Sequence, residues 1–170
     1  RRRGLFIVLE GLDGAGTTTQ SERLMEWFTG AGQPCVRTCE PTDLPVGVLL
    51  RQVLRGELGG ARSKEVDPGA VALLFAADRL DHLSTRVVPA LERGENVISD
   101  RYVYSSLAYQ GSLLPIEWVE TINKRALVPD LTLYVRVSVS TAMSRLGARS
   151  DVRDIYEREP MLASVRNGYE

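Results

Sequence analysis

A glycine-rich stretch near the start of the chain has the spacing of a phosphate-binding loop. Gly11 and Gly16 occupy the two glycine positions of the pattern G-x-x-x-x-G-K-[ST], and Thr18 occupies its last position. Thr17 stands where the pattern has a lysine. Backbone N–H groups of such a loop, and the N-terminus of the helix that follows it, bind phosphate oxygens. The phosphate-binding residues that this pattern predicts are Gly11, Leu12, Asp13, Gly14, Ala15, Gly16, Thr17, Thr18 and Thr19.

The segments on either side of the loop support this interpretation. Residues 5–10 form an apolar run typical of a strand, and residues 18–29 carry apolar side chains at helical spacing. The hydroxyl of Thr18 would be a ligand for Mg²⁺. A dinucleotide-binding fingerprint, G-x-G-x-x-G, would need a glycine at Thr19, so the spacing disfavours it. A glycine-rich turn without a ligand is the other alternative.

A second candidate site follows the strand predicted at residues 96–99. That apolar run is followed directly by Asp100, Arg101 and Tyr102. In open α/β sheets, ligands bind beyond the carboxyl ends of the strands, so Asp100 is expected close to the loop. There its carboxylate would hold Mg²⁺, and Arg101 would bind a phosphate through two N–H groups. A salt bridge at the end of the strand is the structural alternative.

Strand-like and helix-like segments alternate along the chain, which predicts a single α/β domain with a parallel sheet over residues 1–170. The strand candidates are residues 5–10, 35–39, 96–99 and 131–137. The helix candidates are residues 18–29, 68–93 and 116–127. Two polar segments are expected to be a surface loop and a mobile segment, respectively residues 55–64 and 147–159.

Composition narrows the class of protein. A chain of 170 residues with 44% hydrophobic residues can form one ordinary core. Its net charge of −1 gives no positive field that would favour a nucleic-acid partner. Cys35 and Cys39 are interpreted as reduced thiols rather than as a zinc site. The sequence shows neither a signal-peptide core nor a membrane-spanning apolar stretch, so we expect a cytoplasmic protein without a membrane partner.

Five short motifs, in order and at matching spacing, closely resemble thymidylate kinases of the bacterial type, which are P-loop nucleoside monophosphate kinases. They are E-G-L-D-G-A-G at 10–16, E-P-T at 40–42, F-A-A-D-R at 75–79, D-R-Y at 100–102 and S-S-L-A-Y-Q-G at 105–111. The resemblance covers almost the whole chain. It implies a three-layer αβα fold with a five-stranded parallel sheet, one strand more than the four candidates found here.

The same resemblance implies an activity. Members of the family transfer the γ-phosphoryl group of ATP to dTMP, giving dTDP for dTTP synthesis, with Mg²⁺ as cofactor. They are usually homodimers, and the long helix that begins at Pro68 is the expected contact surface.

Residue roles follow from the resemblance one at a time. Phe75 would stack on the thymine ring, and Arg79, one helical turn later, would bond to the edge of the base. Ser106 would contact the pyrimidine, and Tyr109 would pack against the deoxyribose. Without the motif, Phe75 in the core and Arg79 in a surface ion pair would be the simpler interpretation.

The acceptor phosphate is expected to bind Arg101 together with Arg51. Asp13 would lie near this phosphate and Mg²⁺, while Pro41 and Thr42 would shape the loop beneath dTMP. The full set predicted to bind dTMP is Pro41, Thr42, Arg51, Phe75, Arg79, Arg101, Ser106, Tyr109 and Gln110. The catalytic set is Asp13, Arg101, Arg149 and Arg153, and the metal ligands are Thr18 and Asp100.

The catalytic arginines of this set come partly from a lid. Residues 145–157 resemble the family's lid over ATP, and a mobile lid is expected at about 147–159. Our hypothesis is that the positive charge missing at Thr17 is replaced by a lid arginine or by Lys64 or Lys124.

Three other functions are weighed against this one. A non-catalytic nucleotide-binding relative is supported by Thr17 alone. A GTPase would need the guanine-reading motif N-K-x-D, but Ala126 stands where the motif has Asp. A kinase for another nucleotide or for a deoxynucleoside is the third, and Arg101 favours an acceptor that already carries a phosphate.

Overall fold

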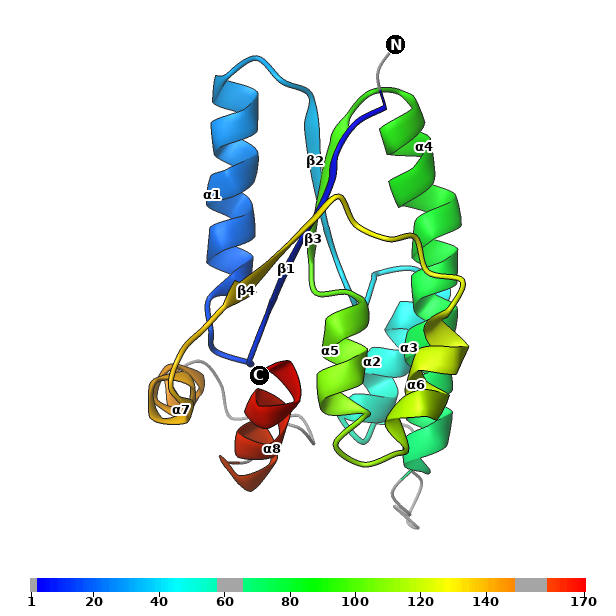
Figure 1. Ribbon diagram of the computed structural model, residues 1–170, viewed down its shortest axis with the longest axis vertical. Coiled ribbons are helices and arrows are strands. Elements are labelled where there is room, and N and C mark those ends of the chain that lie inside the picture. The colour runs from blue at the N-terminus through cyan, green and yellow to red at the C-terminus, as the bar shows by residue number, and fades with distance from the viewer. Residues whose placement is uncertain (1–2, 58–65, 149–158) are drawn as a thin grey trace.

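The computed structural model describes residues 3–57, 66–148 and 159–170. Its four strands are β1 (Phe6–Gly11), β2 (Cys35–Cys39), β3 (Asn96–Asp100) and β4 (Leu131–Val135). They form one parallel sheet in the order β2-β3-β1-β4 (Figure 1). The predicted α/β class and the four predicted strands are therefore confirmed, with ends that differ by one or two residues. The described residues contain no fifth strand of the kind the resemblance implies.

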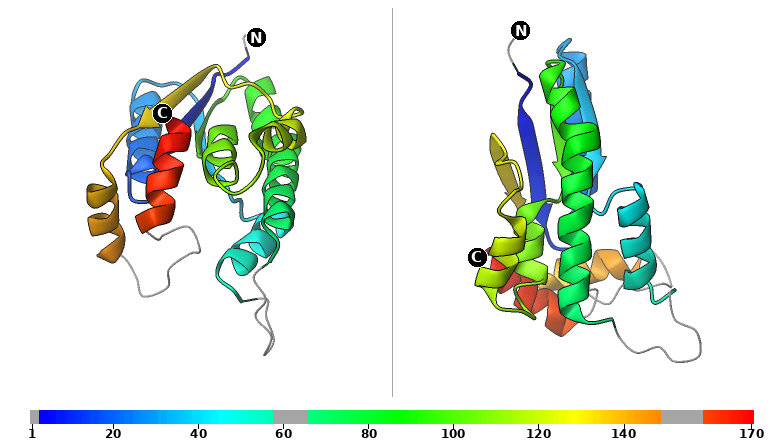
Figure 2. Two further views of the ribbon diagram at one scale, coloured as in Figure 1. Left: turned by 60° about the horizontal axis from the view of Figure 1, so that its bottom comes forward. Right: turned by 90° about the vertical axis from the view of Figure 1, so that its right-hand side faces the viewer.

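Helices follow every strand. Their bounds are α1 (Thr17–Gly30), α2 (Pro45–Leu54), α3 (Pro68–His82), η1 (Leu83–Val87), α4 (Val88–Glu92), α5 (Val103–Tyr109), α6 (Ile116–Asn123), α7 (Val139–Gly147) and α8 (Glu159–Tyr169). α1 lies on one side of the sheet, and α3, α4 and α5 lie on the other (Figures 1 and 2). None of the helices in the described residues has both the length and the apolar character that a membrane crossing needs.

The central strand β1 is buried along its whole length because helices cover both of its faces. Ile7 and Leu9 pack with Phe28 of α1, whereas Phe6 and Val8 pack with the η1–α4 segment on the opposite face. Successive side chains of a strand point to opposite faces, so a continuous apolar run is what a doubly covered strand requires.

Two predicted helices differ from the structure in detail. The helix expected over residues 68–93 is a continuous helical path, but η1 interrupts it with one π-helical segment. Pro89 follows immediately and has no N–H to donate to the carbonyl four residues earlier, which accounts for the irregular turn. The helix expected to reach residue 127 ends at Asn123, whose side-chain amide donates to the Val119 carbonyl.

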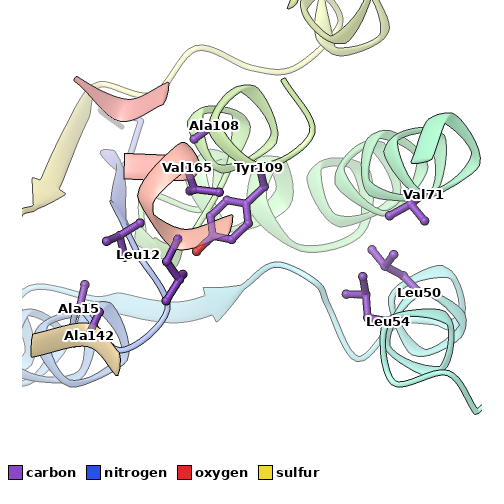
Figure 3. Packing of buried hydrophobic residues seen from close by; sticks show 10 residues of the cluster. Leu12, Ala15, Leu50, Leu54, Val71, Ala108, Tyr109, Ala142 and Val165 are labelled. Atoms are coloured by element: carbon purple, nitrogen blue, oxygen red, sulfur yellow. The ribbon is translucent and has the colours of Figure 1, made fainter. Parts of the chain in front are cut away.

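One apolar cluster lies at the carboxyl end of β1. It joins the glycine-rich loop to α7, α8 and α5 through Leu12, Ala15, Ala142, Val165 and Tyr109 (Figure 3). This cluster sets where the loop stands relative to the helices around it.

The two cysteines lie within the described residues, whereas most of the predicted surface loop and of the predicted lid lies outside them. Cys35 and Cys39 are free thiols, half-buried in β2, as expected. Residues 58–65, and with them most of the predicted surface loop, lie outside the described residues. So do residues 149–158, on which the predicted lid falls.

Candidate active site

The glycine-rich loop has the predicted strand–loop–helix context, since it connects β1 to α1. Gly14 and Gly16 have φ angles of 82° and 96°, a region that favours glycine. A Cβ atom on Gly14 would also stand 2.6 Å from the carbonyl oxygen of Ala142, so α7 can approach the loop only because glycine is there. The Ala15 N–H donates to the Leu12 carbonyl at 2.9 Å and closes the turn.

The two predicted metal ligands lie side by side. β1 and β3 are neighbours in the sheet, with Leu9 opposite Asp100, so the loop and the end of β3 meet at one edge. The Thr18 hydroxyl donates to Asp100 Oδ2 at 2.6 Å. The other carboxylate oxygen, Oδ1, is buried and has no hydrogen-bond partner among the described residues. A carboxylate and a hydroxyl fit Mg²⁺, which binds few protein ligands and takes the rest from water and substrate phosphates.

Arg101 joins the end of β3 to the loop. Its Nη2 forms an ion pair with Asp13 Oδ1 at 2.7 Å, and its Nη1 donates to the Gly11 carbonyl at 2.9 Å. Tyr109 completes the group: its hydroxyl donates to Asp13 Oδ2 at 2.9 Å and accepts from the Asp13 N–H at 3.0 Å. The Arg101 guanidinium lies over the Tyr109 ring, 5.1 Å from its centroid.

The backbone at Arg101 is strained. Its φ of 73° is in the left-handed region, which costs a non-glycine residue about 1–3 kcal/mol. The contacts to Asp13, Gly11 and Tyr109 offset this strain and aim the guanidinium at the loop instead of into solvent.

A buried carboxylate beneath the loop was not predicted. Glu10 is 1% exposed and accepts hydrogen bonds from the Tyr102 N–H at 3.0 Å, the Ser105 hydroxyl at 2.5 Å and the Tyr169 hydroxyl at 3.2 Å. It thereby connects β1, the turn after β3 and α8. Burial raises the pKa of the Glu10 carboxyl above its ordinary value. The signal available in the sequence was an acidic residue inside an otherwise apolar strand.

Two of the residues assigned to the thymine base, Arg79 and Ser106, contact each other inside the protein. Arg79 is 1% exposed, so the alternative of a surface ion pair is wrong. Its Nε donates to Glu40 Oε2 at 2.9 Å, and its Nη2 donates to Ser106 Oγ at 3.1 Å. Its Nη1 donates to Asn123. Phe75, four residues before Arg79 on α3, is half-buried against the apolar cluster at the end of β1.

The segment after β2 is also held by α2 and α3. Asp78 accepts from the Thr42 N–H at 2.8 Å and from the Thr42 hydroxyl. Arg51 donates to the carbonyls of Pro41 and Thr42, the latter at 3.4 Å, so its side chain covers this turn. The Glu40–Pro41 peptide bond is cis.

The remaining predicted site residues lie at other positions of the fold or outside the described residues. Gln110 is buried at the end of α5, and Thr19 is exposed on the first turn of α1. Arg149, Arg153 and Lys64 lie outside the described residues. Lys124 follows α6, which packs against α3 and α5 and stands across the molecule from α7 in Figure 1.

Arg145, the first residue of the stretch that resembles the lid, contacts the loop, although the lid arginines predicted as catalytic were Arg149 and Arg153. Its Nη1 donates to the carbonyls of Gly14 and Ala15 at 3.2 and 3.0 Å. The two partners are about 130 positions away in the chain, and helical spacing on α7 carries no signal for such a contact.

Replacing Glu10 by Gln tests the energetic cost of the buried carboxylate. The raised pKa means that the folded protein holds a proton at pH values where the unfolded chain has released it, above about 4.5. The free energy of unfolding of the wild type should therefore fall relative to that of Glu10→Gln as pH rises from about 5 to about 8. Urea unfolding at both pH values measures the difference.

Glu120→Gln, on an exposed site of α6, is the control and should follow the wild type at both pH values. A wild type that gains stability over Glu10→Gln as pH rises would contradict the raised pKa.

Comparison with known proteins agrees with this geometry. A protein-family model described as thymidylate kinase matches residues 9–170. The chain is 42% identical over 168 residues to a probable thymidylate kinase of Thermococcus kodakarensis, covering 97% of this chain and 82% of the relative. It is 43% identical over 170 residues to a probable thymidylate kinase of Pyrococcus abyssi, covering 98% and 82%. It is 42% identical over 175 residues to a thymidylate kinase of Leifsonia xyli, covering 99% and 81%. The chain therefore belongs to the thymidylate kinase family.

Proposed function

We propose that this protein transfers the γ-phosphoryl group of ATP to the phosphate of dTMP, giving dTDP and ADP. The observation that carries the proposal is the junction of two strand ends: Thr18 bonds to Asp100, and Asp13 pairs with Arg101. The loop predicted to bind ATP phosphates and the arginine predicted to bind the acceptor phosphate thus stand at one edge of the sheet. The relatives of this chain are named thymidylate kinases.

The ATP side of the site is the loop itself. Its backbone N–H groups and the N-terminus of α1, which begins at Thr17, would bind the β- and γ-phosphates. Thr18 and the unpartnered oxygen of Asp100 would hold Mg²⁺. When bound, that ion offsets the negative charge of the phosphates.

The acceptor side would be formed by Arg101 together with residues of the segment after β2 and of α2, α3 and α5. Arg101 and Arg51 would bind the phosphate of dTMP, and Phe75 would stack on the thymine ring. Arg79 and Ser106, already bonded to each other, would present polar groups to the base. Tyr109, whose hydroxyl donates to Asp13, would pack against the sugar. Pro41, Thr42 and Gln110 would line the remainder of this side.

The reaction needs alignment and neutralisation of charge. A phosphate oxygen of dTMP forms a bond to the γ-phosphorus of ATP while the bond from that phosphorus to the bridging oxygen breaks, and the electron pair leaves with ADP. The attacking oxygen is ionised at neutral pH, so no general base is required. Arg101 offsets the repulsion between the two anions, and Asp13 holds the guanidinium in place.

A non-catalytic relative is the alternative function. Its support is Thr17, because the other positions of the loop motif and the D-R-Y turn keep the residue types of the family pattern. The assembled contacts of Asp13, Arg101 and Asp100 favour the kinase.

A steady-state assay with ATP, Mg²⁺ and dTMP tests the proposal directly. Formation of dTDP coupled to release of ADP is expected, and thymidine should not replace dTMP because it offers no phosphate to Arg101. Arg101→Gln should lower kcat/KM by about 10²–10³, the loss typical of one preorganised electrostatic contact.

Arg93→Gln is the matched control, since Arg93 bonds to Glu95 at the surface after α4. It should retain wild-type kinetics. A wild-type preparation that binds ATP and forms no dTDP above background would leave the non-catalytic relative as the better account.

We further propose a cytoplasmic homodimer that associates through α3. This helix carries Leu73, which is 51% exposed although it is apolar. Analytical ultracentrifugation at micromolar protein should show dimers for the wild type and monomers for Leu73→Asp. Val128→Asp, at an exposed apolar residue after α6, is the control and should leave the dimer intact. A monomeric wild type would overturn this surface.

A further inference from the structure

The loop position that usually carries a positive charge, Thr17, carries none in this chain. Thr17 is 5% exposed, and its methyl group lies 3.2 Å from where a Cβ atom on Gly11 would stand. The side chain thus turns back toward the end of β1. The chain has two lysines, Lys64 and Lys124, and neither has a described place near the loop.

Two arginines contact the loop within the described residues. Arg101 is paired with Asp13, so its charge is already partly neutralised. Arg145 makes no ion pair with any described residue and bonds instead to the loop carbonyls of Gly14 and Ala15. Within the described residues, its guanidinium therefore brings to the loop a positive charge that no carboxylate neutralises.

Packing of α7 fixes the position of this charge. Ala142 is fully buried in the cluster that contains Ala15, and Gly14 lets the backbone of α7 approach closely. Figure 3 shows Ala142 beside Ala15. Arg145 is three residues after Ala142 and hence on the same face of the helix, and its Nη1 lies 3.7 Å from where a Cβ atom on Gly16 would stand. α7 thus places Arg145 over the part of the loop that precedes α1.

The contact also acts through the peptide group. The Ala15 carbonyl that accepts from Arg145 belongs to the same peptide unit as the Gly16 N–H. A cation on the carbonyl polarises that unit and strengthens the N–H as a donor to an anion.

Building on the proposed ATP site, we infer that Arg145 replaces the missing lysine of the phosphate-binding loop. Its guanidinium is a cation on α7 that stabilises the binding of the β- and γ-phosphates of ATP. This role is distinct from the one proposed for Arg101, which would bind the acceptor phosphate. A purely structural role, in which Arg145 only holds α7 against the loop, is the alternative.

Binding of AMP, ADP and ATP, measured by calorimetry, separates these roles. Arg145→Gln should lower the affinity for ATP by about 10- to 100-fold and that for AMP little, so the preference for ATP over AMP should decrease. The Arg145 side chain is exposed, and water around its guanidinium keeps the loss of affinity below that for a buried donor. Arg145→Lys should retain most of the preference. Arg136→Gln removes an arginine that pairs with Glu170 beyond β4, and should behave as wild type.

A double variant provides a second test of the inference. Thr17→Lys introduced into Arg145→Gln should restore the preference for ATP over AMP, because it returns the charge to the loop itself. Thermal unfolding confirms that each variant is folded.

The outcomes are distinguishable. If Arg145→Gln lowers the affinities for AMP and ATP by the same factor, the inference is overturned and the proposed function is not. The same holds if the variant loses thermal stability while its preference for ATP over AMP is unchanged. A double variant without rescue also overturns it. A wild type that binds no adenine nucleotide overturns the proposed function and this inference together.

Discussion

The ion pair between Arg101 and Asp13 is the contact on which the arrangement of the site depends. β1 and β3 are adjacent and parallel, so the loop after one and the turn after the other come together at the same edge of the sheet. Adjacency alone would leave two flexible segments side by side. The ion pair, the Thr18–Asp100 hydrogen bond and the Tyr109 hydroxyl convert that adjacency into a fixed geometry. The strained backbone at Arg101 is retained because these contacts hold it.

Buried charge supports this edge from below. The Glu10 carboxyl and the Glu40–Arg79 ion pair are almost completely removed from water. Burial costs free energy for the ion pair and raises the pKa of Glu10. Each has several hydrogen-bond partners, so the cost is limited. These groups contribute more to the positions of neighbouring residues than to the stability of the fold. Glu10 holds the turn that carries Arg101, and Arg79 holds Ser106. Polar contacts thus hold Ser106 and Arg101, two of the residues predicted to bind dTMP.

Local patterns predicted the fold and the loop because both are local properties of the sequence. Spacing of glycines identified the loop, and apolar runs identified all four strands. The roles of Glu10 and Arg145 could not be read in this way, because each depends on partners about 90 to 160 positions away. The same limit applies to Arg79: its helical spacing with Phe75 was visible, but its burial among Glu40, Ser106 and Asn123 was not. The π-helical turn before Pro89 also depends on packing of a helix that periodicity alone describes as regular.

The central claim is that the loop and the Arg101 side form one site that holds both nucleotides in line. A molecule that joins adenosine and thymidine through their 5′ positions by a chain of phosphates tests it most directly, by calorimetric titration. Because linking two ligands makes the second binding event intramolecular, it should bind once per chain and at least about 100-fold more tightly than ATP or dTMP alone. Both nucleotides should displace it. Binding no tighter than that of ATP, with displacement by only one of the two nucleotides, would show that the two halves are separate sites.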